Sequence, residues 1–178
     1  MKRLLITMLI SVVAISGAFT SGKKEPFQKL VPAMDIEKFM GPWYVISFLP
    51  SFLEKDGVNG IETYSLDAKG NIRVEYILYK GSPDGKKKIM HQKGWIVDKT
   101  TNTEWKVQPL WPLKLPYLII DLADDYRYSV VGTNNYKYVW ILAREPVLSE
   151  EDYQGILARL EERGYAIEDI QVMPQIWN

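Results

Sequence analysis

The sequence of 178 residues contains no cysteine and a single histidine, His91. Without thiols the chain cannot form disulfides, thiolate metal sites or a thiol nucleophile, so the fold must be stabilised by its core. One histidine cannot supply a multi-histidine zinc site, and His91 lies in a polar stretch beside Lys86–Lys88 that is typical of a surface. We therefore expect no metal site and no cofactor.

The chain also lacks an excess of positive charge and any motif of a known catalytic type. Its 22 basic and 22 acidic residues predict no surface for nucleic acid. There is no Gly-x-Ser-x-Gly elbow and no glycine-rich phosphate loop. A solvated turn explains Asp121, Asp124 and Asp125 better than a general acid/base pair does. We expect no catalytic residue and no enzymatic activity.

The sequence also lacks a hydrophobic run of transmembrane length, and its longest apolar stretch lies at the N-terminus. Lys2-Arg3 precedes an apolar stretch over residues 4–15, and residues 16–18 are small, in the pattern that a signal peptidase reads. The stretch is shorter than the roughly 18 residues of a transmembrane helix. We interpret residues 1–18 as a secretory signal peptide, with an uncleaved anchor as the alternative.

The remainder of the chain predicts one domain. Residues 19–34 begin with a polar run and are expected to form a flexible leader, followed by the folded domain at 35–178. Export without a cysteine to lipidate predicts a soluble periplasmic or secreted protein that is not lipid-anchored.

Segments rich in Tyr, Trp, Val and Ile dominate this domain and are divided by turn residues, as in 67–71 and 82–85. The predicted strands span roughly residues 43–49, 59–66, 71–79, 88–98, 103–109, 116–122, 126–132 and 137–144. Short successive connections favour an all-β, eight-stranded, up-and-down antiparallel barrel. Closure removes the exposed sheet edges, and eight strands can enclose one small ligand.

Two helices are predicted beside the strands. A short one covers residues 35–40, with Asp35 as N-cap and Gly41 at its end. A C-terminal amphipathic helix begins after the N-cap Ser149 and stops at Gly164. Its apolar stripe consists of Tyr153, Ile156, Leu157 and Leu160. We expect this stripe to pack on the outside of the barrel.

Three motifs in this order resemble the signatures of the lipocalin family, closest to the bacterial and apolipoprotein D-like lipocalins. They are Gly41-Pro42-Trp43-Tyr44, Asp125-Tyr126, and Arg144 within the run from Trp140 to Pro146. The resemblance implies a barrel in which Trp43 plugs the narrow end and Arg144 lies across its indole ring. Gly41, Trp43, Asp125, Tyr126 and Arg144 would then be structural. Asp124 departs from the usual Thr, and the lipidated cysteine of many bacterial relatives is absent.

Because strand side chains alternate between two faces, an inward Trp43 predicts which residues line the barrel. On its strand the interior would receive Val45 and Ser47, and the exterior Tyr44, Ile46 and Phe48. The alternation and the resemblance give as candidate ligand-binding residues Tyr64, Tyr76, Leu78, Tyr138, Trp140 and Leu142. Plain barrel core is the alternative for each. The fourth to sixth strands leave open the faces of Trp95, Trp105 and Tyr117.

Glu62 shares the face of Tyr64 and is a further candidate. It could pair with a cationic or hydroxylated headgroup inside the mouth, or lie at a rim in water. Burying it unpaired would be costly.

The predicted function is therefore non-covalent binding of a small hydrophobic ligand such as a fatty acid or lysophospholipid, for transport, storage or scavenging. The alternatives are a lipocalin-fold enzyme acting on a lipid and a protein-recognition module that uses the open barrel end. Lys86–Lys88 is compatible with transient contact at an anionic membrane surface, although a solvated turn is the simpler interpretation. A homodimer is left open.

Overall fold

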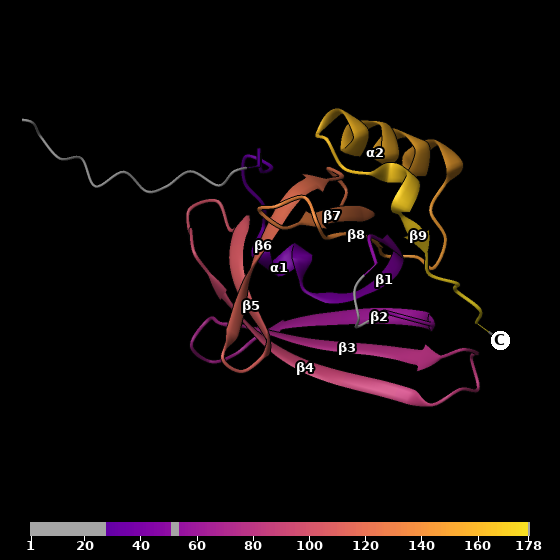
Figure 1. Ribbon diagram of the computed structural model, residues 1–178. Coiled ribbons are helices and arrows are strands. Elements are labelled where there is room, and N and C mark those ends of the chain that lie inside the picture. Colours follow the sequence, from indigo (N-terminus) through magenta and orange to yellow (C-terminus); the bar gives the residue numbers. More distant parts are fainter. Residues whose placement is uncertain (1–27, 51–53, 178) are drawn as a thin grey trace, which may run out of the picture.

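A computed structural model describes residues 28–50 and 54–177 (Figure 1). The predicted signal peptide at residues 1–18 lies outside this part of the chain. Within the described ranges, no helix is long and apolar enough to cross a membrane.

Eight strands follow one another and close into a barrel. They are β1 (Gly41–Phe48), β2 (Gly57–Leu66), β3 (Ile72–Lys80), β4 (Lys87–Ile96), β5 (Glu104–Leu110), β6 (Leu113–Leu122), β7 (Tyr128–Gly132) and β8 (Val139–Ala143). Each pairs antiparallel with the next, and β1 pairs with both β2 and β8. A short strand β9 (Gln171–Val172) adds to β1 beyond its pairing with β2. The predicted up-and-down barrel is confirmed, with strand ends that differ by a few residues.

Both predicted helices are present and capped as expected. The helix α1 (Ile36–Phe39) follows Asp35, whose carboxylate accepts from the Glu37 backbone N–H at 3.0 Å. The helix α2 (Glu150–Glu162) follows Ser149, whose Oγ accepts from the Asp152 N–H at 3.1 Å. Gly164 ends it with a φ of +90°, which favours glycine. A turn of 3₁₀ helix, η1 (Ile167–Asp169), leads from α2 to β9.

The barrel wall separates two apolar clusters. The inner core fills the barrel and includes Phe39, Trp43, Val45, Phe48, Tyr64, Ile72, Val74, Tyr76, Leu78, Trp105, Val107, Tyr117, Ile119 and Leu142. The outer core lies between the wall and α2 and includes Ile46, Leu118, Ile120, Val130, Val139, Ile141, Ile156 and Leu160. The α2 stripe therefore covers the outside of the barrel as predicted, and Figure 1 shows α2 beside β7 and β8.

The predicted faces are wrong at the end of β1. Val45 is opposite Leu142, but Ser47 is opposite Ile141, because a β-bulge shifts the register between Val45 and Ser47. An extra residue in one strand reverses the alternation that follows it. Phe48 consequently joins the inner core instead of pointing outward, and Ser47 is opposite a residue of the outer core.

The described part of the predicted leader, residues 28–34, contacts the barrel. The Gln28 side-chain amide donates to the Tyr165 hydroxyl at 2.7 Å. The Val31 N–H donates to the Ile119 carbonyl at 3.1 Å, and Met34 is buried in the inner core. The polar composition of residues 19–29 does not reveal these long-range partners.

Candidate ligand-binding site

One end of the barrel is closed by aromatic packing around α1, which lies within the ring of strands in Figure 1. The Phe39 ring has centroid distances of 5.0 Å to Trp43, 5.4 Å to Tyr64 and 5.3 Å to Trp105. The segment before α1 is tied to this end because the Asp35 N–H donates to the Tyr126 hydroxyl at 2.7 Å. These side chains leave the closed end filled.

The predicted contact between Arg144 and Trp43 is present at this end. The Arg144 guanidinium lies 3.7 Å from the centroid of the Trp43 ring, a cation–π geometry. The same guanidinium donates to three backbone carbonyls, those of Pro42, Lys38 and Met40. Gly41 adopts a φ of +95° where the chain turns from α1 into β1, as expected of a glycine there.

A cavity of about 60 Å³ lies in the other half of the barrel. Its lining is mostly apolar or aromatic and comes from six strands and two connecting segments. The lining residues are Glu54, Glu62, Tyr76, Gln92, Val107, Pro109, Leu115, Pro116, Tyr117, Thr133 and Trp140. Two carboxylates therefore face an otherwise weakly polar space.

Glu62 is buried, with only 6% of its surface exposed, so the structure selects the interior position over the rim. Its carboxylate accepts hydrogen bonds from the hydroxyls of Tyr64 and, at 3.5 Å, Tyr117. Burial raises the pKa of Glu62 to about 7, because removing the ionised form from water outweighs those two hydrogen bonds. The nearby carboxylate of Glu54 raises the pKa further.

The second carboxylate comes from the segment that precedes β2. Glu54 is 1% exposed, and its Oε1 accepts from the Trp140 indole N–H at 3.1 Å. The hydroxyl of Tyr76 is also buried but has no hydrogen-bond partner. Burial, with Glu54 and Glu62 nearby, raises the pKa of Tyr76 well above its ordinary value. A buried polar atom without a partner is rare and marks a place where a ligand or water can bind.

The structure brings together three of the predicted ligand-binding residues, Glu62, Tyr76 and Trp140, around the cavity. Tyr64 reaches this group through its hydrogen bond to Glu62. Leu78 and Leu142 belong to the inner core and do not line the cavity. These six residues all lie on the inward faces that the alternation predicted.

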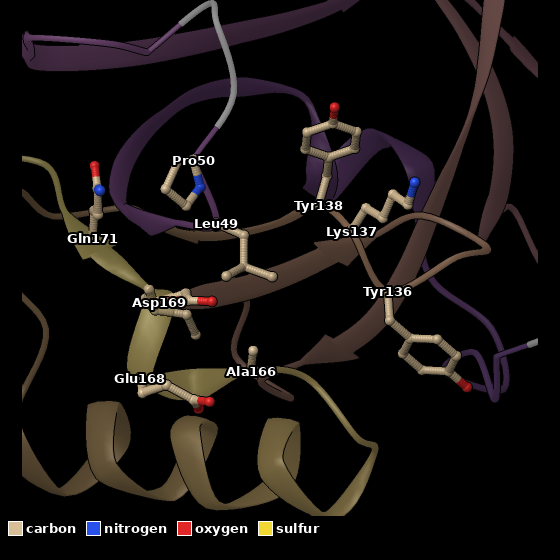
Figure 2. A pocket seen from close by; sticks show the side chains of 10 residues that line it. Leu49, Pro50, Tyr136, Lys137, Tyr138, Ala166, Glu168, Asp169 and Gln171 are labelled. Carbon is tan, nitrogen blue, oxygen red and sulfur yellow. The ribbon is translucent and has the colours of Figure 1, made fainter.

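Tyr138 lies at the rim and not in the cavity. It precedes β8, stacks on Trp140 with a centroid distance of 6.1 Å, and lines a groove outside the barrel. Figure 2 shows this groove between the β7–β8 turn, with Tyr136 and Lys137, and the η1 residues Glu168 and Asp169. The groove is open to solvent and has a mixed polar and apolar lining.

Sequence reasoning missed some inward-facing residues and left others undecided. Trp105 and Tyr117, whose faces were left open, both point inward, whereas Trp95 lies outside beneath Lys114 at 4.1 Å. Alternation from Trp105 would also have indicated Val107. Glu54 carries no such signal because it lies in a connecting segment with no strand period.

The open end of the barrel exposes apolar side chains at the β5–β6 turn. Leu110, Trp111 and Leu113 are 70%, 80% and 52% exposed. The β3–β4 turn lies at the same end because successive strands alternate in direction. The exposed Lys86 belongs to this turn, and the exposed Lys87 is the first residue of β4. His91 is also on the surface, as predicted, and its Nε2 is 3.1 Å from Glu75.

Comparison of the sequence with known proteins finds matches in one family. The family model of the lipocalin-like domain matches residues 34–175. Apolipoprotein D of Mus musculus is 32% identical over an alignment that covers 96% of this chain and 96% of that protein. Temperature-induced lipocalin-1 of Arabidopsis thaliana is 30% identical over 162 residues, 86% of this chain and 84% of its own. Outer membrane lipoprotein Blc of Escherichia coli K12 is 29% identical over 140 residues, covering 78% and 77%.

Solved structures show the same barrel at lower identity. Insecticyanin from the tobacco hornworm Manduca sexta superposes with a TM-score of 0.63 at 19% identity, covering 85% of each chain. Lobster apocrustacyanin A1 superposes with a TM-score of 0.62 at 13% identity, covering 79% of each chain. At this identity the likeness concerns the fold.

Proposed function

The chain belongs to the lipocalin family, and from this premise we propose that it binds a small hydrophobic ligand non-covalently in the open half of its barrel and does not transform it. The observation that carries the proposal is the interior cavity, which lies beside a filled closed end and has a largely apolar lining. Fatty acids, lysophospholipids and similar lipids are the proposed ligand class, with transport, storage or scavenging as the role.

The free volume limits how such a ligand enters. A cavity of about 60 Å³ has room for about two water molecules, whereas ligand pockets usually measure roughly 300–1,000 Å³. An acyl chain must therefore displace lining side chains as it binds. The side of the barrel between β4 and β5 supports this, because the pairing of these strands stops at Lys93 and Gln108. Beyond that point Met90 and Gln92 of β4 are only half-buried.

Filling the cavity tests the location of the site. Leu115→Trp should occupy the cavity from β6 and weaken decanol or lysophospholipid binding at least tenfold, about 1.4 kcal/mol. Lys114→Trp is the matched control, because it places the same ring on the neighbouring, exposed position of the same strand. Equal affinities of the parent and Leu115→Trp would place the ligand elsewhere.

Native mass spectrometry of protein purified from its own source addresses the alternatives. Bound lipid that is extracted unchanged supports the binding role, and turnover of that lipid during incubation would favour a lipocalin-fold enzyme. An empty barrel with a co-purifying protein would favour the protein-recognition module. The same spectra report whether the protein is a homodimer.

Export forms a second part of the proposal and rests on the N-terminal pattern. Residues 1–18 combine a basic start, an apolar stretch and a small-residue cleavage pattern, and the chain has no cysteine for an N-terminal lipid. We expect a mature N-terminus near Phe19 and a periplasmic or secreted protein. Retention of Met1 or an acylated terminus, found by N-terminal sequencing or mass spectrometry, would contradict this.

The open end supports transient contact with an anionic membrane surface. Trp and Leu side chains insert at the headgroup level, and lysines are attracted to anionic lipid. The exposed Trp111 and Leu110 lie at the same end as Lys86 and Lys87. Trp111→Ser should weaken binding to vesicles of phosphatidylglycerol and phosphatidylcholine severalfold, and Trp177→Ser at the far C-terminus should not. Identical vesicle binding by both variants would exclude the β5–β6 turn as the contact.

A further inference from the structure

We propose that the cavity selects ligands whose inner end is an organic ammonium ion attached to an apolar body; this inference rests on the proposed ligand-binding function. The class is a hydrophobic primary amine, bound with its cationic head at Glu62 and its apolar part toward the open end.

Two carboxylates supply hydrogen-bond acceptors to the cavity. The carboxylates of Glu62 and Glu54 both line it and are 6% and 1% exposed. They come from separate parts of the chain, since Glu62 belongs to β2 and Glu54 lies in the segment before that strand. Buried carboxylates need nearby positive charge or hydrogen-bond donors to remain ionised.

Whereas both carboxylates accept hydrogen bonds, a third polar atom of the lining has no partner. The Tyr76 hydroxyl is buried in the same lining, with 1% of the residue exposed, and makes no hydrogen bond. Tyr76 is directly opposite Glu62 in the β2–β3 register. An ammonium group that reached Glu62 would therefore bring its donors to the side of the cavity where Tyr76 can accept one.

The described lining residues include no lysine, arginine or histidine. The titratable groups facing Glu62 are Tyr64 on its own strand, Tyr76 on β3, Tyr117 on β6 and Glu54. Lys88 is on the inward face of β4 nearer the rim, opposite Leu78, and has contacts of its own. Arg144 lies at the closed end over Trp43. The groups that act on Glu62 are thus tyrosines and a carboxylate, and a bound cation would bring a positive charge to the Glu62 carboxylate.

The aromatic walls fit the same head group. Trp140, Tyr76 and Tyr117 line the cavity around the carboxylates, and aromatic faces attract cations most strongly where water is excluded. The free volume of about 60 Å³ suits an ammonium group with the first carbons of its chain. The remainder would pass Leu115 and Met90 toward the rim. A ligand carboxylate in the same position would be repelled by Glu54 and by ionised Glu62.

The titration of Glu62 gives this selection a pH dependence. Because burial raises its pKa to about 7, Glu62 gains negative charge as the pH rises through neutrality. An alkylamine stays protonated over that range because its pKa, like that of lysine, is about 10. Amine affinity should therefore rise with pH through about 7, and carboxylate affinity should fall.

Three probes with one chain and different heads test the inference: decylamine, decanol and decanoate, each titrated below its micelle concentration. At about pH 8 we expect decylamine to bind at least tenfold more tightly than decanol, with decanoate weakest. At about pH 6 the advantage of decylamine over decanoate should shrink severalfold, because Glu62 is then largely protonated. Decanoate binding as tightly as decylamine at the higher pH overturns the inference, as does a preference that ignores pH.

Glu62→Gln removes the charge and keeps the shape. It should lower decylamine affinity at least tenfold at about pH 8, leave decanol within about threefold, and flatten the pH dependence. Glu75→Gln is the matched control, since Glu75 is on the outer face of β3 beside exposed His91. Unchanged decylamine affinity in a folded Glu62→Gln variant refutes the role of Glu62. If decanol binds but decylamine has no advantage, only this inference fails; if none of the three binds, the proposed function fails.

Discussion

The two halves of the barrel are built on the same strands but differ in the side chains that occupy their interiors. On β2, Tyr64 contacts the aromatic plug of the closed end, and Glu62, two residues away on the same face, lines the cavity. The closed half contains interlocked rings and an arginine whose donors reach backbone carbonyls. The open half contains two buried carboxylates and a hydroxyl without a partner. Aromatic packing thus fills the closed half, and the buried hydroxyl of Tyr76, which has no hydrogen-bond partner, lies in the half that contains the cavity.

The two tryptophans near the strand ends express this contrast. The Trp43 indole N–H donates to a backbone carbonyl, that of Phe39, at 2.8 Å. The Trp140 indole N–H donates to a side chain, the carboxylate of Glu54, at 3.1 Å. A side-chain acceptor can move with its residue more readily than a backbone carbonyl held next to a helix. We therefore expect adjustment on ligand binding at Trp140 and rigidity at Trp43.

The largest expected effect is at the closed end. Trp43 is fully buried, so Trp43→Ala should lower the free energy of unfolding by about 3–5 kcal/mol through lost packing and the cavity left behind. Urea denaturation measures it, with Trp140→Ala as the comparison at the open end. Because Trp140 is only half-buried, Trp140→Ala should lower the free energy of unfolding by less than half as much as Trp43→Ala. Equal costs would mean that the two halves do not differ in packing.

The next effect is specific to the open half and depends on pH. Folded Glu62, with a pKa of about 7, keeps its proton where the unfolded chain, with the ordinary value of 4.5, has lost it. The stability of the parent should therefore fall as the pH rises from 4.5 to about 7 and then level off. Glu62→Gln lacks this loss. Relative to the parent, Glu62→Gln should therefore gain about 2–3 kcal/mol in its free energy of unfolding between about pH 5 and about pH 8.

Urea denaturation of both proteins at the two pH values checks this prediction, and Glu75→Gln serves as the exposed control. A difference between Glu62→Gln and the parent that stays constant with pH would show that Glu62 is not buried in the folded protein.

The smallest of the three expected effects on stability concerns Arg144 at the closed end. Arg144→Ala removes one cation–π contact and the donors to three carbonyls but leaves the Trp43 ring packed, so we expect a loss of about 2 kcal/mol. Arg144→Lys keeps the charge without the planar fork and should recover part of that loss. Chemical denaturation that finds Arg144→Ala costlier than Trp43→Ala would reverse the assigned roles of ring and cation.

Sequence reasoning worked where a local rule governs the backbone. Alternation on β2 and β3 placed Tyr64, Tyr76 and Leu78 inside, as observed. It failed on β1 because one extra residue before Ser47 changes the face of Phe48, and a bulge leaves no clear mark in the residue pattern. On β6 the pattern left Tyr117 undecided because apolar residues occupy both faces of that strand. On β5 the alternation of Trp105 with Glu104 and Lys106 would have indicated its inward face.

The sequence by itself determined the strand order and the caps of α1 and α2, because each depends on a short pattern of turn or cap residues. The contact of Arg144 with Trp43 followed from the resemblance of the signature residues to those of lipocalins. Only the tertiary structure decided that Glu54 lies beside Glu62, that Tyr76 lacks a partner, and that the free space is about 60 Å³. Those properties depend on side chains from six strands and two connecting segments meeting in one volume. No local period encodes the space that remains when such side chains have been packed.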